Sequence, residues 1–325
     1  NKKQTRDDRK IDETIELSGV EVIGAKAFYG CESLDYIVIP DSLEVIEEST
    51  FENCKALGMH DMAFYRGVNA VQFGTGVTEI KDAAFKGCSG LQELGLESTG
   101  ITELDVSGNT ALRSLNVNGT DISALDTSNN TELEVLQCSG CYNLTTLDLS
   151  NNTKLQEVDV SGTYVTAVNF GTNAELTTVK AKETRINTLD LSACNNVTMV
   201  EVSGEIGAIN VNDATGLTAL DVSGCNFLSE LQFQNTGITT IDLSSMGSLS
   251  IVNGSGSGVR DITISSTSPQ TVDFSDCTSL VSLSADAGTT LDVSGCAALT
   301  TLETGGSFTA LDLSTCTNLT TLKLN

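Results

Sequence analysis

The sequence has no tryptophan, two prolines and one histidine, and only 5% of its 325 residues are aromatic. A core built around a few large rings is therefore excluded, and the apolar 39% must pack as many small aliphatic layers. With His60 as the single histidine, a Ser-His-Asp or Cys-His site could be built at one place only. No run of about 18 apolar residues is present, which excludes a membrane-spanning helix.

Basic residues are also scarce. The chain has 17 Lys and Arg against 43 Asp and Glu, for a net charge of −26. Such a field repels nucleic acid and anionic membranes, whereas cationic partners and divalent metals remain compatible. The polar start at Asn1 carries no signal peptide, so we expect export only on the strength of a family resemblance.

What the chain does have is an internal repeat. In Leu144–Val160, LTTLDLSNNTKLQEVDV, aliphatic residues occupy positions 1, 4 and 6 twice in succession. A period near 20 residues is typical of a solenoid, in which each coil buries its apolar side against the next. We expect positions 1, 4 and 6 to point inward and positions 2, 3, 5, 7 and 8 to face outward.

A first repeat type occupies residues 15–96, after a polar lead-in at residues 1–14. Its pattern, VxxIxxxAFxxCxxLxxIxIP, occurs around Cys31, Cys54 and Cys88. It resembles the BspA-type leucine-rich repeats of bacterial surface proteins. Uneven spacing of Phe28, Phe51, Phe64 and Phe85 predicts a shortened coil around Gly58–Gly67, which contains His60.

A second repeat type, of about 21 residues per coil, occupies residues 97–325 and continues the first. It resembles the LxxLxLxxN/CxxL repeats of internalin-like proteins, but both halves of each coil here read as LxxLxV. We therefore predict a right-handed leucine-rich-repeat β-solenoid of parallel strands, with strands on both sides and little regular helix. A break in the alternation of half-coils predicts a phase slip, and hence a bend or bulge, between Gly216 and Gly258.

Position 9 carries Asn or Cys at each coil. Asn there can satisfy backbone groups, and Cys can replace it as a small buried group. The ten cysteines could pair between coils, but parallel side chains favour reduced thiols in the core. Cys138-Ser-Gly-Cys141 could suggest redox or zinc chemistry, yet its register and an extended span of roughly 10 Å favour core packing. The glycines of Gly254–Gly258 lack the lysine and helix start of a phosphate-binding loop.

Outward position 5 carries a row of aspartates. Stacked carboxylates repel one another, and calcium could relieve that repulsion with oxygen ligands from adjacent coils. The alternative is that each Asp pairs with neighbouring Ser and Thr groups. The residues of this calcium hypothesis are Asp105, Asp126, Asp148 and Asp190.

A second outward row is polar, varied and poor in aromatics. Such variation on a regular face is expected of a protein-binding surface, although drift on an unused surface would also produce it. The candidate binding residues are Arg113, Asn116, Glu134, Gln137, Glu157, Asp159, Lys180 and Lys182.

The resemblance implies a non-enzymatic bacterial protein, cell-surface or secreted, that binds or adheres to a host or cell-surface ligand through the solenoid face. The alternative is a structural spacer or stalk within a larger multidomain surface protein. An enzyme ranks last, because one histidine and no nucleotide-binding motif leave few catalytic parts. No cofactor other than calcium is indicated, and the sequence leaves the ligand and the oligomeric state open.

Overall fold

The computed structural model describes residues 17–324 except 59–70, 75, 82, 267–269, 307 and 309. The chain forms two compact units, residues 1–164 and 165–325. Each unit is a parallel-strand β-solenoid, and the described residues contain no helix. The prediction of a leucine-rich-repeat solenoid with little regular helix is confirmed. The described part of the chain has no helix with the length and hydropathy to cross a membrane.

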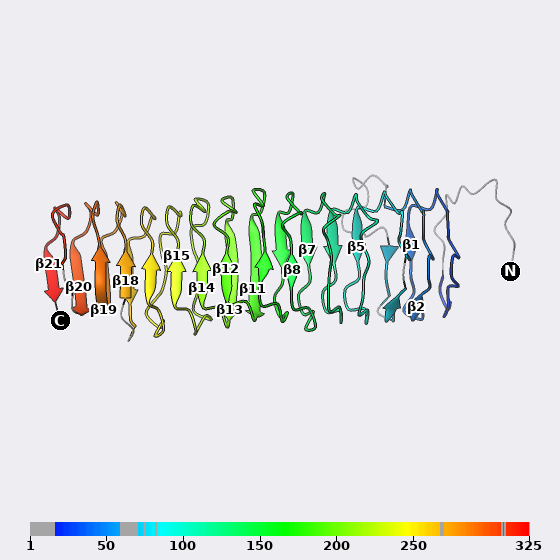
Figure 1. Ribbon diagram of the computed structural model, residues 1–325, viewed down its shortest axis with the longest axis horizontal. Helices are drawn as coiled ribbons and strands as arrows, with labels where there is room; N and C mark the ends of the chain where they lie inside the picture. The colour runs from blue at the N-terminus through cyan, green and yellow to red at the C-terminus, as the bar shows by residue number, and fades with distance from the viewer. Residues whose placement is uncertain are drawn as a thin grey trace. The chain divides into compact units, whose positions relative to one another are not determined.

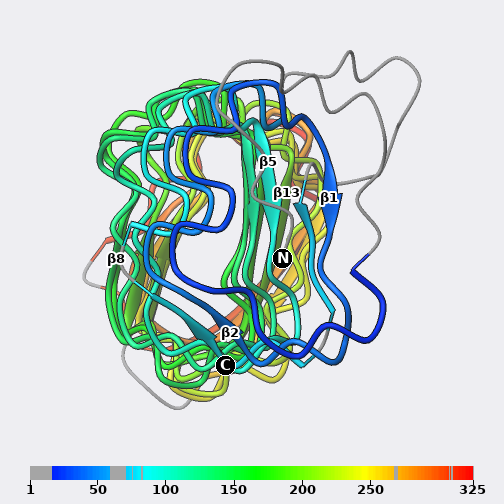
Figure 2. The ribbon, with the colours of Figure 1, turned by 90° about the vertical axis from the view of Figure 1, so that its right-hand side faces the viewer.

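In the first unit, short strands recur once per coil on one side, in the order β1-β3-β5-β6-β7-β9, all parallel. On another side β2 pairs with β4. Seen end-on, β1 and β5 lie across the coil from β8 (Figure 2). The strands are β1 Ile37–Val38, β2 Val45–Ile46, β3 Val71–Gln72, β4 Glu79–Ile80, β5 Glu93–Gly95, β6 Ser114–Asn116, β7 Val135–Gln137, β8 Leu147–Asp148 and β9 Glu157–Asp159.

In the second unit, the longest sheet has the order β12-β14-β15-β16-β18-β19-β20-β21, again parallel, and β17 pairs with β19 (Figure 1). On the other side of the coil β11 pairs with β13. The strands are β10 Val168–Asn169, β11 Thr178–Thr184, β12 Thr188–Asp190, β13 Met199–Gly204, β14 Ala208–Asn210, β15 Glu230–Gln232, β16 Ile251–Asn253, β17 Asp261–Ile264, β18 Gln270–Asp273, β19 Ser282–Asp292, β20 Thr301–Gly306 and β21 Thr321–Leu324.

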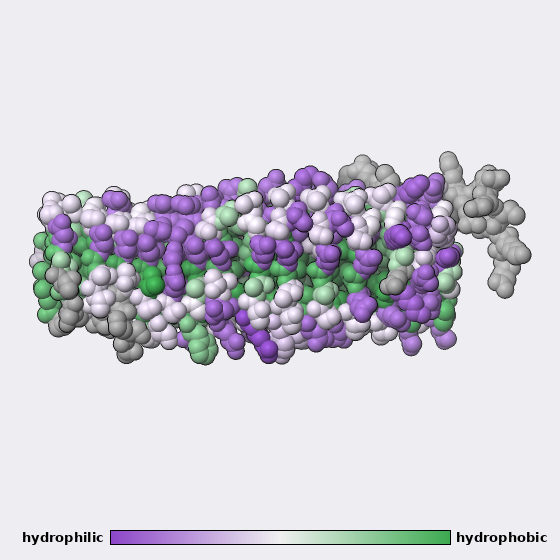
Figure 3. Space-filling model, in the orientation of Figure 1, coloured by the Kyte–Doolittle hydropathy of each residue, from purple (hydrophilic) through white to green (hydrophobic). Residues whose placement is uncertain are grey.

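The inward and outward positions follow the repeat. Leu144, Leu147 and Leu149 are buried, whereas Thr145 and Thr146 are exposed. Each buried aliphatic side chain contributes roughly 1.5–3 kcal/mol, but only when the neighbouring coils cover it. The core of each unit is therefore a stack of aliphatic layers. On the face that Figure 3 shows, hydrophilic side chains (purple) cover much of the surface, with apolar ones (green) between them.

Position 9 satisfies the backbone, as predicted. Nδ2 of Asn130 donates to the carbonyl oxygens of Val106 at 3.0 Å and Asn109 at 2.8 Å. In the second unit, Sγ of Cys277 donates to the carbonyl oxygen of Gly254 at 3.0 Å, the equivalent bond with a thiol. Asn and Cys thus perform the same structural task, which explains why they alternate at one position.

The shortened coil predicted around Gly58–Gly67 is wrong. The ring of Phe51 stacks on that of Phe85 with centroids 5.3 Å apart, and Ile37 pairs directly with Val71. Equivalent residues of these two coils are 34 positions apart in the sequence, whereas Asn109 and Asn130 of two regular coils are 21 apart. One coil is therefore lengthened. Residues 59–70, including His60, lie outside the described residues.

The predicted bulge between Gly216 and Gly258 is also wrong. β14, β15 and β16 pair there without a register shift, and Ala219 bridges Thr240 on the other side. The break in the sequence pattern has another cause. Asp221 and Asp242, the aspartates at position 5 in this region, lie on the side of the coil opposite β15 and β16. The register shifts of the second unit fall elsewhere, between Ala181 and Thr184, between Gln270 and Thr271, and between Ala285 and Gly288.

Candidate functional site

Four strands of the first unit, β5, β6, β7 and β9, form a regular polar face, here called the polar sheet. The middle residue of each strand is buried: Leu94, Leu115, Leu136 and Val158. The residues on either side of it face outward and are partly exposed, except Gly95, which is buried. Strand pairing places them in two rows, Glu93, Ser114, Val135, Glu157 and Gly95, Asn116, Gln137, Asp159.

An ion pair joins two coils at the edge of the polar sheet. Nη2 and Nε of Arg113 donate to Oε1 of Glu134 at 2.5 and 2.9 Å. The Arg113 side chain is 53% exposed, so the pair contributes at most about 1 kcal/mol to stability. Its consequence is positional, because it holds the guanidinium over the neighbouring coil. Beside it, burial raises the pKa of the Glu93 carboxyl, and the Arg113 charge partly offsets this.

The polar sheet brings together six of the eight candidate binding residues. Arg113, Asn116, Glu134, Gln137, Glu157 and Asp159 lie on its strands or immediately before them. Two of these also serve the turn that follows: Oδ1 of Asn116 accepts from the N–H of Asn118 at 3.0 Å, and Oδ1 of Asp159 from that of Ser161 at 2.9 Å.

Lys180 and Lys182 belong to the second unit. Both lie on β11, where Lys180 stands opposite Glu201 of β13. Nζ of Lys182 and Oε2 of Glu201 form an ion pair at 2.6 Å, which lowers the pKa of Glu201. In the second unit these two lysines and Glu201 thus form one charged group on β11 and β13.

Each aspartate of the proposed calcium row caps a turn. Oδ1 of Asp105, Asp126, Asp148 and Asp190 accepts the backbone N–H of the Ser two residues later, at 2.9–3.0 Å. Hydrogen bonds from Ser107 and Ser128 lower the pKa values of Asp105 and Asp126. Among the described residues, no three His, Cys, Asp or Glu side chains gather as a metal site would need. Calcium binding by this row stays a hypothesis.

All ten cysteines are buried and none forms a disulfide. In the CxxC segment, Sγ of Cys138 donates to the carbonyl oxygen of Asp159 at 3.3 Å and Sγ of Cys141 to that of Val117 at 3.0 Å. Burial raises the pKa of Cys138 well above its ordinary value and that of Cys54 to about 12. The reactive form of cysteine is the thiolate, so these protonated, buried thiols act as core residues.

The glycines of Gly254–Gly258 also have a packing role. A Cβ on Gly254 would lie 2.5 Å from the ring of Phe233 and 2.9 Å from that of Phe274. The two rings meet edge to face, with centroids 6.2 Å apart. The absence of a Cβ at Gly254 thus leaves the space that the two phenylalanine rings occupy.

Sequence reasoning missed an exposed aromatic pair in the first unit. Tyr142 and Tyr164 are 62% and 42% exposed, and their ring centroids are 6.2 Å apart. Their spacing of one coil along the sequence is the signal that could have placed them side by side. Sequence reasoning also missed a cavity lined by Glu79 and Glu103.

The sequence model of the BspA-type leucine-rich repeat region matches residues 8–62 and 58–180. It describes a repeat region and not a catalytic family. The search of curated protein sequences returns no match. The chain is also similar to several solved structures.

The first of these is the functional domain of InlJ from Listeria monocytogenes, with 22% identity over 77% of this chain, a TM-score of 0.33, and 58% of that chain covered. The chain therefore spans less than two thirds of that relative. The second is an internalin (inlF) from the same organism, with 19% identity over 78% of each chain and a TM-score of 0.35. The third is a leucine-rich repeat protein from Bacteroides ovatus, with 17% identity over 93% of this chain and 87% of that chain, and a TM-score of 0.30.

Proposed function

The chain belongs to the family of BspA-type leucine-rich repeat proteins, and from this premise we propose that it is a non-enzymatic protein-binding module. It acts at the bacterial cell surface or outside the cell, and its ligand docks on the polar sheet of the first unit. The ligand is a protein and not a nucleic acid, because the net charge of −26 repels phosphates.

One observation carries the proposal: the rows of the polar sheet change chemistry from coil to coil. Along one row the partly exposed residues are Asn116, Gln137 and Asp159, held in register by β6, β7 and β9. The spacing between coils is roughly 4.8 Å, so different groups stand at fixed intervals on a rigid backbone. Fixed and dissimilar groups are what selective recognition of a protein surface needs.

The contrast with the aspartate row supports this interpretation. There the same residue recurs at Asp105, Asp126 and Asp148, and each makes the same bond to a following serine. A position that repeats its residue has a repeated structural task. On the polar sheet Asn116 and Asp159 make the same kind of turn bond, but the residue at that position changes from coil to coil, so turn formation alone does not account for the variation.

The test is binding of the intact chain to a panel of purified host matrix and cell-surface proteins, measured by biolayer interferometry with and without EDTA. The double variant Asn116→Lys/Gln137→Lys adds two positive charges to the polar sheet. Thr145→Lys/Thr146→Lys makes the same change in charge at exposed residues just before β8. We expect the first variant to weaken binding at least about tenfold and the second to retain it.

Equal loss of binding in both variants would contradict the polar sheet as the docking face. Absence of binding to every protein of the panel would favour the alternative, a spacer that holds another domain away from the cell. That alternative also predicts that neither variant affects attachment of cells that carry the protein.

A further inference from the structure

A second surface of the first unit has the features of a binding site. β2 pairs with β4 through Val45–Glu79 and Ile46–Ile80, but the ladder stops there. Residues 102–105 of the following coil form no strand. Within the described residues of this region, no backbone hydrogen bond joins Glu79–Lys81 to residues 102–105. The outer edge of β4 is therefore unpaired, and an unpaired strand edge is open to main-chain hydrogen bonds from another chain.

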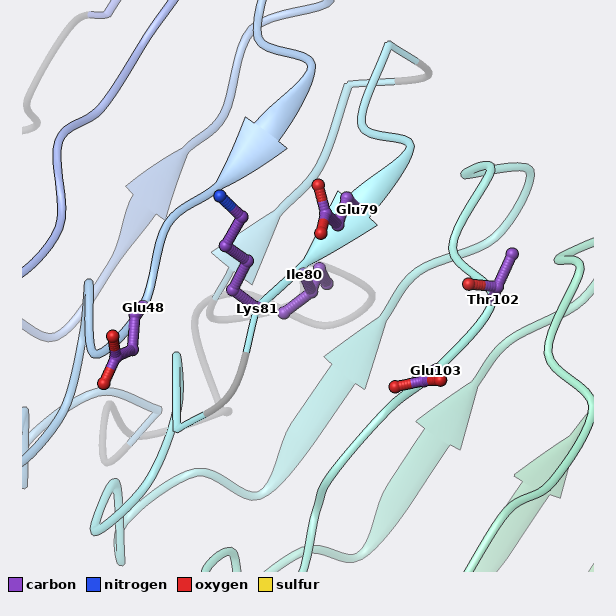
Figure 4. A pocket seen from close by; sticks show the side chains of 6 residues that line it. All are labelled: Glu48, Glu79, Ile80, Lys81, Thr102 and Glu103. Carbon is purple, nitrogen blue, oxygen red and sulfur yellow. The ribbon is translucent and has the colours of Figure 1, made fainter.

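A cavity of about 380 Å³ lies over this interruption. The close-up shows side chains from three successive coils around it, with Glu48 on one side, Glu103 on the other and Ile80 and Lys81 between them (Figure 4). A second cavity of about 320 Å³ shares Ile80, Lys81, Thr102 and Glu103 and extends to Asp105 and Asp126. The two cavities are therefore neighbours, and together we name them the acidic groove.

The charges of the acidic groove are unbalanced. Glu48, Glu79 and Glu103 carry three negative charges around the first cavity, and none of them forms an ion pair among the described residues. The one cation in the lining, Lys81, is committed elsewhere: its Nζ donates to both carboxylate oxygens of Glu47, at 3.1 and 2.9 Å. That bond raises the pKa of Lys81, so Lys81 stays charged, and one positive charge offsets only part of the negative charge of the three glutamates.

The arrangement of these carboxylates selects the kind of cation. They are spread around the groove and do not gather closely enough for a metal ion, since no such group exists among the described residues. Separated carboxylates suit an extended cationic side chain. Ile80, Leu104 and Ala84 supply apolar surface beside the acids. Lys and Arg combine an apolar stem with a charged head, and so match such a lining.

We propose that the acidic groove binds a basic, extended segment of a partner protein. A Lys or Arg side chain enters the cavity between Glu48, Glu79 and Glu103, and the segment's backbone lies along the free edge of β4. This surface is separate from the polar sheet, so the proposal stands whether or not the polar sheet binds a ligand.

The probe is a fluorescein-labelled peptide with alternating Arg and Thr residues, titrated with the intact chain and followed by fluorescence anisotropy. Glu79→Gln/Glu103→Gln removes two charges from the groove. Glu97→Gln/Asp121→Asn removes two charges from exposed positions of the first unit outside it. We expect the groove variant to weaken binding about tenfold and the control variant to change it less than twofold. Circular dichroism of both variants establishes that the fold is retained.

Equal weakening in both variants would overturn the proposal, because it would mean that the overall field of the chain attracts the peptide. Competition by spermine at the same concentration as an unlabelled peptide would also overturn it, since any flexible cation would then suffice. Asn116→Lys/Gln137→Lys separates this test from that of the polar sheet: it must leave binding at the groove within twofold, because its added charges lie on the side that carries β6 and β7.

Discussion

Nδ2 of Asn130 donates to the carbonyl oxygen of Asn109 at 2.8 Å, and Nδ2 of Asn152 repeats the bond to the carbonyl oxygen of Asn130 at 2.9 Å. Each asparagine thereby ties its own coil to the one before it. The side chains are fully or almost fully buried, so no water replaces the bond when it is lost. The column is a hydrogen-bonded spine that runs beside the aliphatic core.

Replacement of Asn130 tests the strength of that spine. Asn130→Ala leaves the buried carbonyls of Val106 and Asn109 without this donor, and we expect the free energy of unfolding to fall by about 2–4 kcal/mol. Asn130→Cys should lose about half as much, because Cys277 shows that a thiol keeps one such bond. The measurement is urea denaturation followed by circular dichroism. Asn129→Ala, at an exposed neighbour, should remain within about 0.5 kcal/mol, and an equal effect at both positions would contradict the prediction.

The same periodicity explains how much of the structure could be predicted. Leu144, Leu147 and Leu149 were placed correctly, because one spacing of apolar residues determines which side chains point inward along every coil. The outward position of the six candidate binding residues on the polar sheet follows from the same rule. The prediction of a shortened coil was wrong because it counted Phe64 as a repeat position. In the structure Phe51 stacks directly on Phe85.

The acidic groove could not be predicted for a different reason. It depends on whether the backbone of Glu79–Lys81 pairs with the following coil. The outward residues there have the same polar character as those that flank paired strands. A local loss of pairing has no signature in the spacing of leucines, so only the structure reveals that Glu79 and Glu103 line one cavity.

Gly254 provides a test of packing in the second unit. Its missing Cβ leaves room for the buried rings of Phe233 and Phe274, so Gly254→Ala should lower the free energy of unfolding by about 1–3 kcal/mol. At Gly247, a Cβ meets nothing within 4 Å, and Gly247→Ala should be neutral or slightly stabilising. In a Phe233→Leu background the cost of Gly254→Ala should shrink, as thermal denaturation of the four variants would show. An unchanged cost would mean that the ring is not the obstacle.

Calcium titration decides the role of the aspartate row. The calcium hypothesis predicts that about 1–5 mM Ca²⁺ raises the melting temperature and that Asp126→Asn/Asp148→Asn abolishes the rise. Neighbouring carboxylates such as Asp105 and Asp126 repel one another, which is the cost that a cation would relieve. Magnesium at the same concentration is the control for ionic strength. A melting temperature that calcium leaves unchanged would refute the hypothesis and leave the turn bonds as the function of the row.

The turn bonds themselves predict a dependence on pH. Hydrogen bonds from Ser128 hold the pKa of Asp126 below its ordinary value of 3.8, and Asp105, Asp221, Asp242 and Asp312 are lowered in the same way. The unfolded chain therefore binds protons more readily than the folded one. The stability that these groups contribute is complete above the unfolded pKa and is lost as the pH falls through the folded pKa.

Urea midpoints measured between about pH 2 and pH 6 should accordingly decrease below about pH 4, and Asp126→Asn should flatten part of that decrease. Asn116 offers a matched control, because its Oδ1 accepts the equivalent turn bond from Asn118 but cannot titrate. Asn116→Ala should lower stability by a similar amount at every pH and leave the slope unchanged. If both variants changed the slope equally, the pH dependence would arise from the loss of a turn and not from the protonation of Asp126.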